Sequence, residues 1–209
     1  SWLQRICSAL RGVASVDSSC GIHVHVGLKD YATGQWLVSS EDFDGDYTDY
    51  DVAMAVVGRV GYAYGYFQPV LNKMVARSRR NGQWSHDTSY LVRQFDNPQL
   101  LVVDDDRYWD DENESFEYKT KTVKHPILIG QTLYNKLREQ GRYQCVNPEA
   151  FSKYGTIEFR SHQGSANANK IQNWIDICYA LTARCASHGW DDITQYNGES
   201  YHDFMTYLG

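Results

Sequence analysis

The sequence predicts an α+β fold, and three observations support this prediction. Helical spacing of apolar residues recurs in four segments, near residues 2–13, 51–74, 127–140 and 171–185. Two short segments, 20–28 and 156–162, alternate apolar and polar residues as half-buried strands do. The 209-residue chain is 42% hydrophobic and 22% charged, which suits one globular core. Because no repeat, linker or low-complexity segment divides residues 1–209, we expect a single domain.

The first quarter of the chain predicts a helix, a strand and a loop. Apolar residues from Trp2 to Val13 recur at helical spacing and predict an amphipathic opening helix. In residues 20–28, the side chains of His23 and His25 fall on one strand face, and branched apolar residues fall on the other. Residues 31–50 are rich in Asp, Gly, Ser and Thr, so we expect a loop or hairpin there.

A long helical pattern then begins at Asp51 and continues to Met74. Asp49 or Asp51 is placed to cap its start. Pro69 is expected to kink this helix, because proline removes a backbone N–H and clashes with the preceding turn.

Residues 95–125 predict an inserted hairpin, with strands at 100–103 and 116–123 joined by an acidic loop over 104–115. A helix is expected at 127–140, and a strand at 156–162. In that strand Glu158, Arg160 and His162 should share one face. Asn167 or Asn169 should cap a last helix that ends near Gly189.

Charge and cysteine content exclude several classes of protein. Twenty Lys and Arg against 26 Asp and Glu give a net charge of −6, which argues against general affinity for nucleic acid or anionic membrane. No apolar run approaches the roughly 20 residues of a membrane helix. Five cysteines without a CxxC pair predict neither a disulfide framework nor an all-cysteine zinc site. We therefore expect a protein of a reducing, cytoplasmic compartment that does not bind membranes or nucleic acid.

The polar faces of the two predicted strands, at 20–28 and 156–162, hold the candidate metal-binding and phosphate-binding side chains. Neutral imidazoles and a carboxylate can coordinate a divalent metal, and a neighbouring Arg can neutralise phosphate oxygens. This combination favours nucleotide chemistry, although an HxH strand taken alone also occurs as a structural feature or as part of a zinc site. The basic run at 77–80 has a second interpretation as well, because cations at the end of a helix oppose its macrodipole.

Four motifs occur together in one order: CGIHVHVG at 20–27, SRRN at 78–81, RYQCVN at 142–147 and GTIEFRSHQGS at 155–165. In these motifs the chain, over roughly residues 3–186, resembles the putative amidoligase family. That family is similar to carboxylate–amine ligases with the glutamine synthetase catalytic fold, including glutamate–cysteine ligases. The resemblance implies a curved, mostly antiparallel sheet with helices on one side and an open cleft on the other.

The resemblance also implies roles for nine residues and two cofactors, ATP and Mg²⁺. It implies that the metal ligands are His23 and Glu158. It implies that the catalytic residues are His25, Arg80 and Arg160. It implies that ATP and substrate are bound by Arg79, Arg142, Asn147 and His162.

The implied function is ATP-dependent formation of an amide or peptide bond through an acyl phosphate, with an amino acid, a peptide or a polyamine as substrate. Members of the family normally begin with a Gly-x-Glu-x-Glu strand, and this chain starts after it. We therefore expect that strand in a longer precursor or in a separate N-terminal fragment that assembles with this chain. Association of several copies of this chain into a homo-oligomer is the other expected assembly. The expected source is a bacterium or a phage.

Two alternatives remain open. The first is a catalytically silent domain of this fold that serves as a structural or interaction module, for example in a phage particle. The second is a zinc-dependent hydrolase that uses His23, His25 and Glu158.

Overall fold

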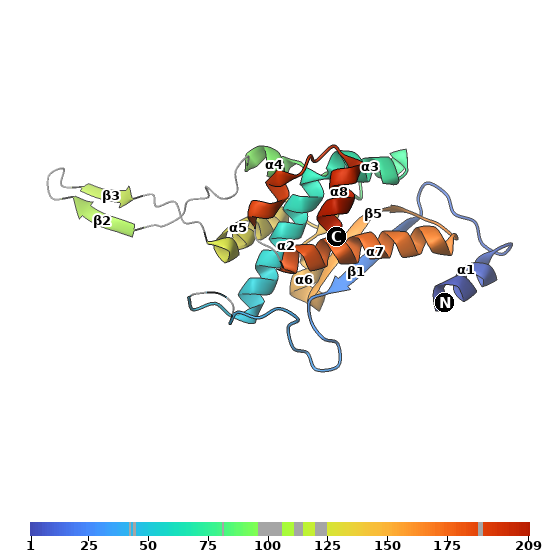
Figure 1. The fold of residues 1–209 in the computed structure, drawn as a ribbon, viewed down its shortest axis with the longest axis horizontal. Helices are drawn as coiled ribbons and strands as arrows, with labels where there is room; N and C mark the ends of the chain where they lie inside the picture. Colours follow the sequence, from blue (N-terminus) through green and yellow to red (C-terminus); the bar gives the residue numbers. More distant parts are fainter. Residues whose placement is uncertain are drawn as a thin grey trace.

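A computed structural model describes residues 1–41, 43, 45–80, 82–95, 106–110, 115–119, 125–187 and 190–209, with the backbone alone at 106–110, 115–119 and 190–192. Its main sheet contains β1 (Gly21–Gly27), β4 (Val146–Asn147) and β5 (Thr156–Gln163), in the order β1–β5–β4. Both strand pairs are antiparallel. Together with the helices around it, this sheet confirms the predicted α+β class (Figure 1).

The register of the sheet separates an apolar face from a polar face. Val24 and Val146 both pair with Phe159, and all three side chains are buried in the core. The next row consists of His25 and Asn147, which both pair with Glu158. Because directly opposed residues project from the same side of a sheet, these two rows occupy opposite faces.

The predicted long helix is present as two helices, α2 (Asp49–Tyr66) and α3 (Gln68–Met74). The break falls at Phe67 because Pro69 lies in the first turn of α3, so the expected kink is a full interruption. The predicted cap was wrong by one position. Thr48 is the N-cap, and Asp51 completes a capping box by accepting the backbone N–H of Thr48.

Helix α2 forms the centre of the core, where it packs against α5 (Pro126–Glu139) and α7 (Ala168–Ser187). Figure 1 shows α7 lying along β1 and crossing α2. Asn167 caps α7 as predicted, because its Oδ1 accepts the backbone N–H groups of Asn169 and Lys170. The predicted stop at Gly189 lies outside the described residues.

The other elements are short. They comprise α1 (Trp2–Leu10), the 3-10 helix η1 (Arg77–Arg79), α4 (Tyr90–Gln94), α6 (Glu149–Tyr154), the 3-10 helix η3 (Trp190–Gln195) and α8 (Tyr201–Leu208). The opening helix α1 ends three residues before the predicted Val13. All five cysteines are free, as the sequence indicated. No helix among the described residues is long and apolar enough to cross a bilayer.

A second, two-stranded antiparallel sheet pairs β2 (Asp106–Asp110) with β3 (Ser115–Lys119). The hairpin expected within 95–125 therefore exists, but a strand occupies 106–110, where we expected loop. Tyr108 and Trp109 favour strand structure, and this local preference prevails over the acidic composition. The other strand predicted, at 100–103, lies outside the described residues.

Candidate active site

The polar face of the main sheet is organised around one carboxylate, Glu158. Its Oε1 lies 2.7 Å from Nδ1 of His23 and accepts a hydrogen bond from Nη1 of Arg160, also at 2.7 Å. Its other oxygen, Oε2, accepts a hydrogen bond from the amide of Asn147 at 2.5 Å. The structure thus brings together four of the predicted site residues from three strands.

Strand periodicity explains this convergence. His23 and His25 lie two residues apart on β1, as do Glu158 and Arg160 on β5, so each pair projects from one face. The β1–β5 register shifts by one residue between Ile22 and Val24. This irregularity is a β-bulge, which leaves two residues of β5 opposite His23 and brings that imidazole diagonally onto Glu158.

The cluster has a buried floor and an open rim. Glu158 and Arg160 are 6% and 8% exposed, whereas the side chains of His23 and His25 are 39% and 42% exposed. A ligand that approaches this face therefore meets the two imidazoles first, and the carboxylate of Glu158 beneath them holds His23 in place.

Charge interactions set the protonation of the cluster. Burial alone would raise the pKa of Glu158, but the hydrogen bond from Asn147 and the charge of Arg160 bring this pKa below its usual value. Burial, followed by repulsion from Arg160, lowers the pKa of His23 despite the attraction of Glu158. At neutral pH, His23 is therefore uncharged and donates Nδ1–H to the carboxylate, which leaves Nε2 as a lone-pair donor.

His25 is positioned differently. Its Nδ1 lies 3.0 Å from the hydroxyl of Thr156, and its Nε2 lies 3.9 Å from Oε1 of Glu158. Tyr154 makes an edge contact with the imidazole ring. These contacts fix the orientation of the ring and leave its Nε2 side open on the sheet face.

Arg160 is held on three sides. Besides its bond to Glu158, its Nε donates to the carbonyl of Trp84 at 3.3 Å, and its guanidinium lies 5.7 Å from the ring centre of Tyr143. Arg142, which is exposed, stacks over the same ring at 4.9 Å. Sequence reasoning missed Tyr143 and Thr156, although both lie inside the motifs at 142–147 and 155–165. Trp84 contributes through its backbone, so no sequence signal pointed to it.

Arg79 approaches the same face at the start of β1. A Cβ on Gly21 would lie 3.1 Å from Nη1 of Arg79, so the guanidinium covers the backbone at this glycine. Gly21 shares a strand face with His23, which places Arg79 on the polar side. This buried arginine also donates to the carbonyls of Ser18 and Ser19, and thereby ties η1 to the chain before β1.

Arg80 and His162 are not joined to Glu158 by any contact among the described residues. Arg80 donates through Nε and Nη2 to the carbonyl of Val75, the C-cap of α3, which is the helix-end role that the sequence left open. The expectation that His162 shares the face of Glu158 was wrong. Its ring packs on Trp174 of α7, with ring centroids 5.3 Å apart. The reason is that the bulge interrupts the alternation of side chains along β5 between Phe159 and His162, so His162 projects from the other face.

The donor set does not fit a resident Mg²⁺ ion. Mg²⁺ prefers oxygen ligands, but both oxygens of Glu158 already accept hydrogen bonds, and Arg160 places a positive charge beside them. Within the described ranges there is no group of three or more His, Cys, Asp or Glu side chains that could hold a metal ion. In this geometry Glu158 accepts the Nδ1–H of His23 and orients its ring. Carboxylates orient metal-binding histidines in the same way, by accepting the ring N–H that does not face the metal.

No curated protein and no solved structure matches the chain. The model of the family described as "Putative amidoligase enzyme" matches residues 63–182. That span includes Asn147, Glu158 and Arg160 but begins after the histidines of β1. Because it covers more than half of the 209 residues, this chain belongs to the amidoligase family.

Proposed function

We propose that the chain is an ATP-dependent carboxylate–amine ligase that forms an amide or peptide bond. Membership of the amidoligase family supports a ligase-type function. The observation that carries the proposal is the preorganised Arg160 on an open sheet face, with two accessible imidazoles beside it. The antiparallel sheet with helices against its apolar face agrees with a glutamine synthetase-like catalytic fold, which forms part of the proposal.

Arg160 has the character needed to stabilise a phosphoryl group in transfer. Negative charge spreads over the oxygens of that group, and fixed cations lower the barrier because they need not reorganise. Glu158, the Trp84 carbonyl and the Tyr143 ring restrain the guanidinium. Since Arg160 and Glu158 cancel in charge, attraction of the triphosphate depends on the additional cations Arg79 and Arg142.

The reaction has two steps. A substrate carboxylate oxygen attacks the γ-phosphorus of ATP, the bond to ADP breaks, and an acyl phosphate forms. The amine nitrogen then attacks the acyl carbon, the bond to phosphate breaks, and the nitrogen loses a proton. We assign that proton to Nε2 of His25, which carries the lone pair when Nδ1–H is donated to Thr156.

Magnesium enters this proposal with the nucleotide. ATP in cells carries Mg²⁺ on its phosphates, and Mg²⁺ is commonly held by substrate phosphates with few protein ligands. The residues described here supply orientation and positive charge, and we derive no step from the metal. The amine and carboxylate donors remain amino acids, peptides or polyamines, and the proposed compartment is the cytoplasm.

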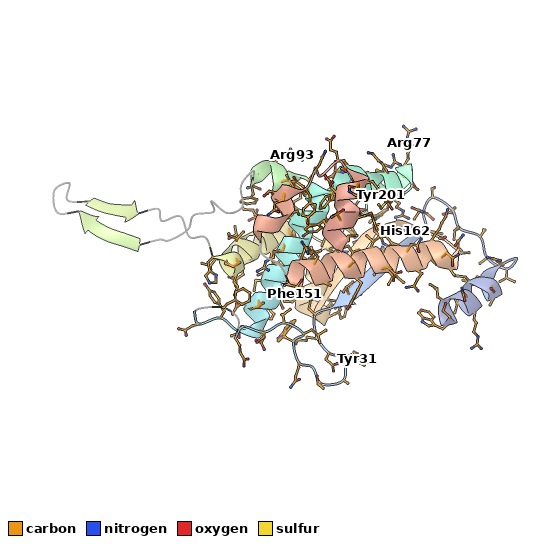
Figure 2. All side chains as sticks on the ribbon, in the orientation of Figure 1. Tyr31, Arg77, Arg93, Phe151, His162 and Tyr201 are labelled. Carbon is orange, nitrogen blue, oxygen red and sulfur yellow. The ribbon has the colours of Figure 1, made fainter. Side chains whose placement is uncertain are left out.

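The test is a coupled assay of ADP and phosphate release with Mg-ATP and mixtures of carboxylate and amine donors. It uses the protein together with any sequence encoded before Ser1. Release should require both donors. Arg160→Lys should lower kcat by about 100-fold or more, since lysine cannot reproduce the forked contacts. The matched control is Arg93→Ala on α4, which removes an exposed arginine whose side chain, within the described part of the chain, donates to the nearby Ser89 (Figure 2).

Three outcomes would contradict the proposal. Phosphate release that does not depend on an amine would indicate a phosphatase or an ATPase. Failure to bind Mg-ATP would favour a structural module of this fold. Activity that needs Zn²⁺ and no nucleotide would support the hydrolase alternative.

A further inference from the structure

A cavity of about 260 Å³ lies beside His162, which pairs with Ile22 and so projects from the face of the main sheet opposite to Glu158. It opens between the end of β5, α3, the first half of α7 and the start of α8. Figure 2 labels two of its lining residues, His162 at the sheet and Tyr201 at the start of α8. The candidate active site makes no use of this cavity.

His162 lines the cavity and has a hydrogen-bond acceptor that no described residue uses. The residue is 96% buried, as its exposed fraction of 4% shows. Its Nδ1 lies 2.7 Å from the carbonyl of Gln163, and a carbonyl only accepts, so Nδ1 carries the proton. In the neutral ring, Nε2 then carries a lone pair, and no described residue donates to it.

The neutral form of His162 is favoured by its surroundings. Burial lowers the pKa of His162, the positive charge of Lys170 acts in the same direction, and the bond to Gln163 opposes both. A ligand that meets Nε2 must therefore bring its own N–H or O–H donor.

Lys170 adds a cation to the same wall. Lys170, Asn173 and Ile177 recur at intervals of three and four residues on α7, so they form one stripe of the helix that faces the cavity. Lys170 is exposed, and it makes no ion pair with any residue in the described part of the chain. Its ammonium group is therefore free to meet an anionic group of a ligand.

Apart from Gln163, the rest of the lining is mostly apolar, and the volume is small. Met74, Trp174, Ile177 and Tyr201 contribute hydrocarbon and aromatic surface. Pockets for drug-sized ligands begin near about 300 Å³, so this cavity of about 260 Å³ suits a smaller molecule. Such a ligand would combine an anionic group, a hydrogen-bond donor and a compact apolar part.

We propose that this cavity binds a free α-amino acid with an apolar side chain. The carboxylate pairs with Lys170, the ammonium donates to Nε2 of His162 and to the Asn173 amide oxygen, and the side chain packs on Met74 and Ile177. The site is separate from the polar face around Glu158, so the inference does not depend on the proposed ligase function.

The test is titration of the 15N-labelled chain with L-phenylalanine, followed through the indole N–H resonance of Trp174. The variant Trp174→Phe identifies that resonance. The expected result is a saturable shift in the wild type and a dissociation constant about tenfold or more higher in Lys170→Ala, because a charge-assisted bond is lost. Lys153→Ala on α6 removes a lysine outside the cavity and should leave the constant unchanged.

Two analogues separate the parts of the proposal. 3-Phenylpropionate lacks the ammonium and 2-phenylethylamine lacks the carboxylate, so each should bind about tenfold more weakly than L-phenylalanine. In His162→Phe, discrimination between L-phenylalanine and 3-phenylpropionate should fall, because Asn173 is then the one remaining proposed acceptor for the ammonium. The proposal is overturned if no saturable shift occurs at millimolar L-phenylalanine, L-leucine or L-methionine. It is equally overturned if Lys170→Ala binds as the wild type does, or if the analogues bind as tightly as the amino acid.

Discussion

Nδ1 of His23 lies 2.7 Å from Oε1 of Glu158, although the residue directly opposite Glu158 in the β1–β5 register is His25. The diagonal histidine makes the short contact because Thr156 holds Nδ1 of His25, whose Nε2 stays 3.9 Å from the carboxylate. The two histidines of one strand face therefore have different roles. His23 is fixed by the carboxylate, and His25 keeps one side open for a substrate.

The buried carboxylate of Glu158 should make the free energy of unfolding depend on pH in the acid range. The folded-state pKa of Glu158 lies below its ordinary value near 4.5, so its stabilisation is complete above that value and is lost as the pH falls through the folded pKa. Glu158→Gln should cost about 3 kcal/mol at neutral pH, because it leaves Arg160 buried without its counterion. Urea unfolding from neutrality to about pH 3 measures the difference, which should shrink in acid.

The matched control is Glu139→Gln, which removes an exposed carboxylate paired with Lys136 on α5. It should cost less than about 1 kcal/mol at any pH. A difference between wild type and Glu158→Gln that stays constant across the acid range would show that Glu158 does not carry the ionic role described here.

His23 should titrate below its ordinary value near 6.5, first because it is partly buried and second because Arg160 repels its charged form. Removing that charge with Arg160→Gln should raise the pKa of His23. NMR titration of the imidazole Cε1–H resonances measures this change. A fall in the pKa of His23 would contradict the electrostatic assignment.

Because the folded-state pKa of His23 is depressed, its contribution to stability is complete above about pH 6.5. That contribution is lost as the pH falls toward the folded value, where protonation would charge the imidazole beside Arg160. Stability should therefore decline on acidification before Glu158 begins to titrate.

The hydroxyl of Thr156 should matter for turnover more than for binding. Thr156→Val removes the group that holds Nδ1 of His25 and should lower kcat about tenfold with the KM for ATP unchanged, if His25 accepts the amine proton. Thr132→Val on α5 is the control, since its hydroxyl donates to the carbonyl of Leu128, four residues earlier on the same helix, and lies away from His25 in the sequence. Equal kinetics in the wild type and Thr156→Val would remove His25 from the proposed mechanism.

Helices α2 and α5 meet through two glycines. A Cβ on Gly58 would overlap the carbonyl oxygen of Gly130, and a Cβ on Gly130 would lie 2.6 Å from Cα of Ala55. Backbone atoms cannot rotate away as a side chain can, so Gly58→Ala should destabilise the fold by about 3 kcal/mol despite the better helix propensity of alanine. Thermal or urea unfolding measures the loss, and a stabilised Gly58→Ala protein would mean that the helices pack less closely.

Several features could be read from local sequence. The alternation that places His23 with His25, and Glu158 with Arg160, follows from the two-residue period of a strand. The break before Pro69 and the cap at Asn167 follow from backbone chemistry within a few residues. The motifs around these strands were sufficient to predict the amidoligase family.

Other features were decided by tertiary structure. The bulge in the β1–β5 pair turns His162 toward Trp174, and residues 131 positions apart, His25 and Thr156, meet across that pair. The backbone of Trp84 reaches Arg160 from outside every strand. Local sequence sets the direction of each side chain along its own strand, whereas the register between distant strands is set by packing of the whole core. The sequence by itself therefore determined which residues share a strand face, and only the tertiary structure decided which of them touch.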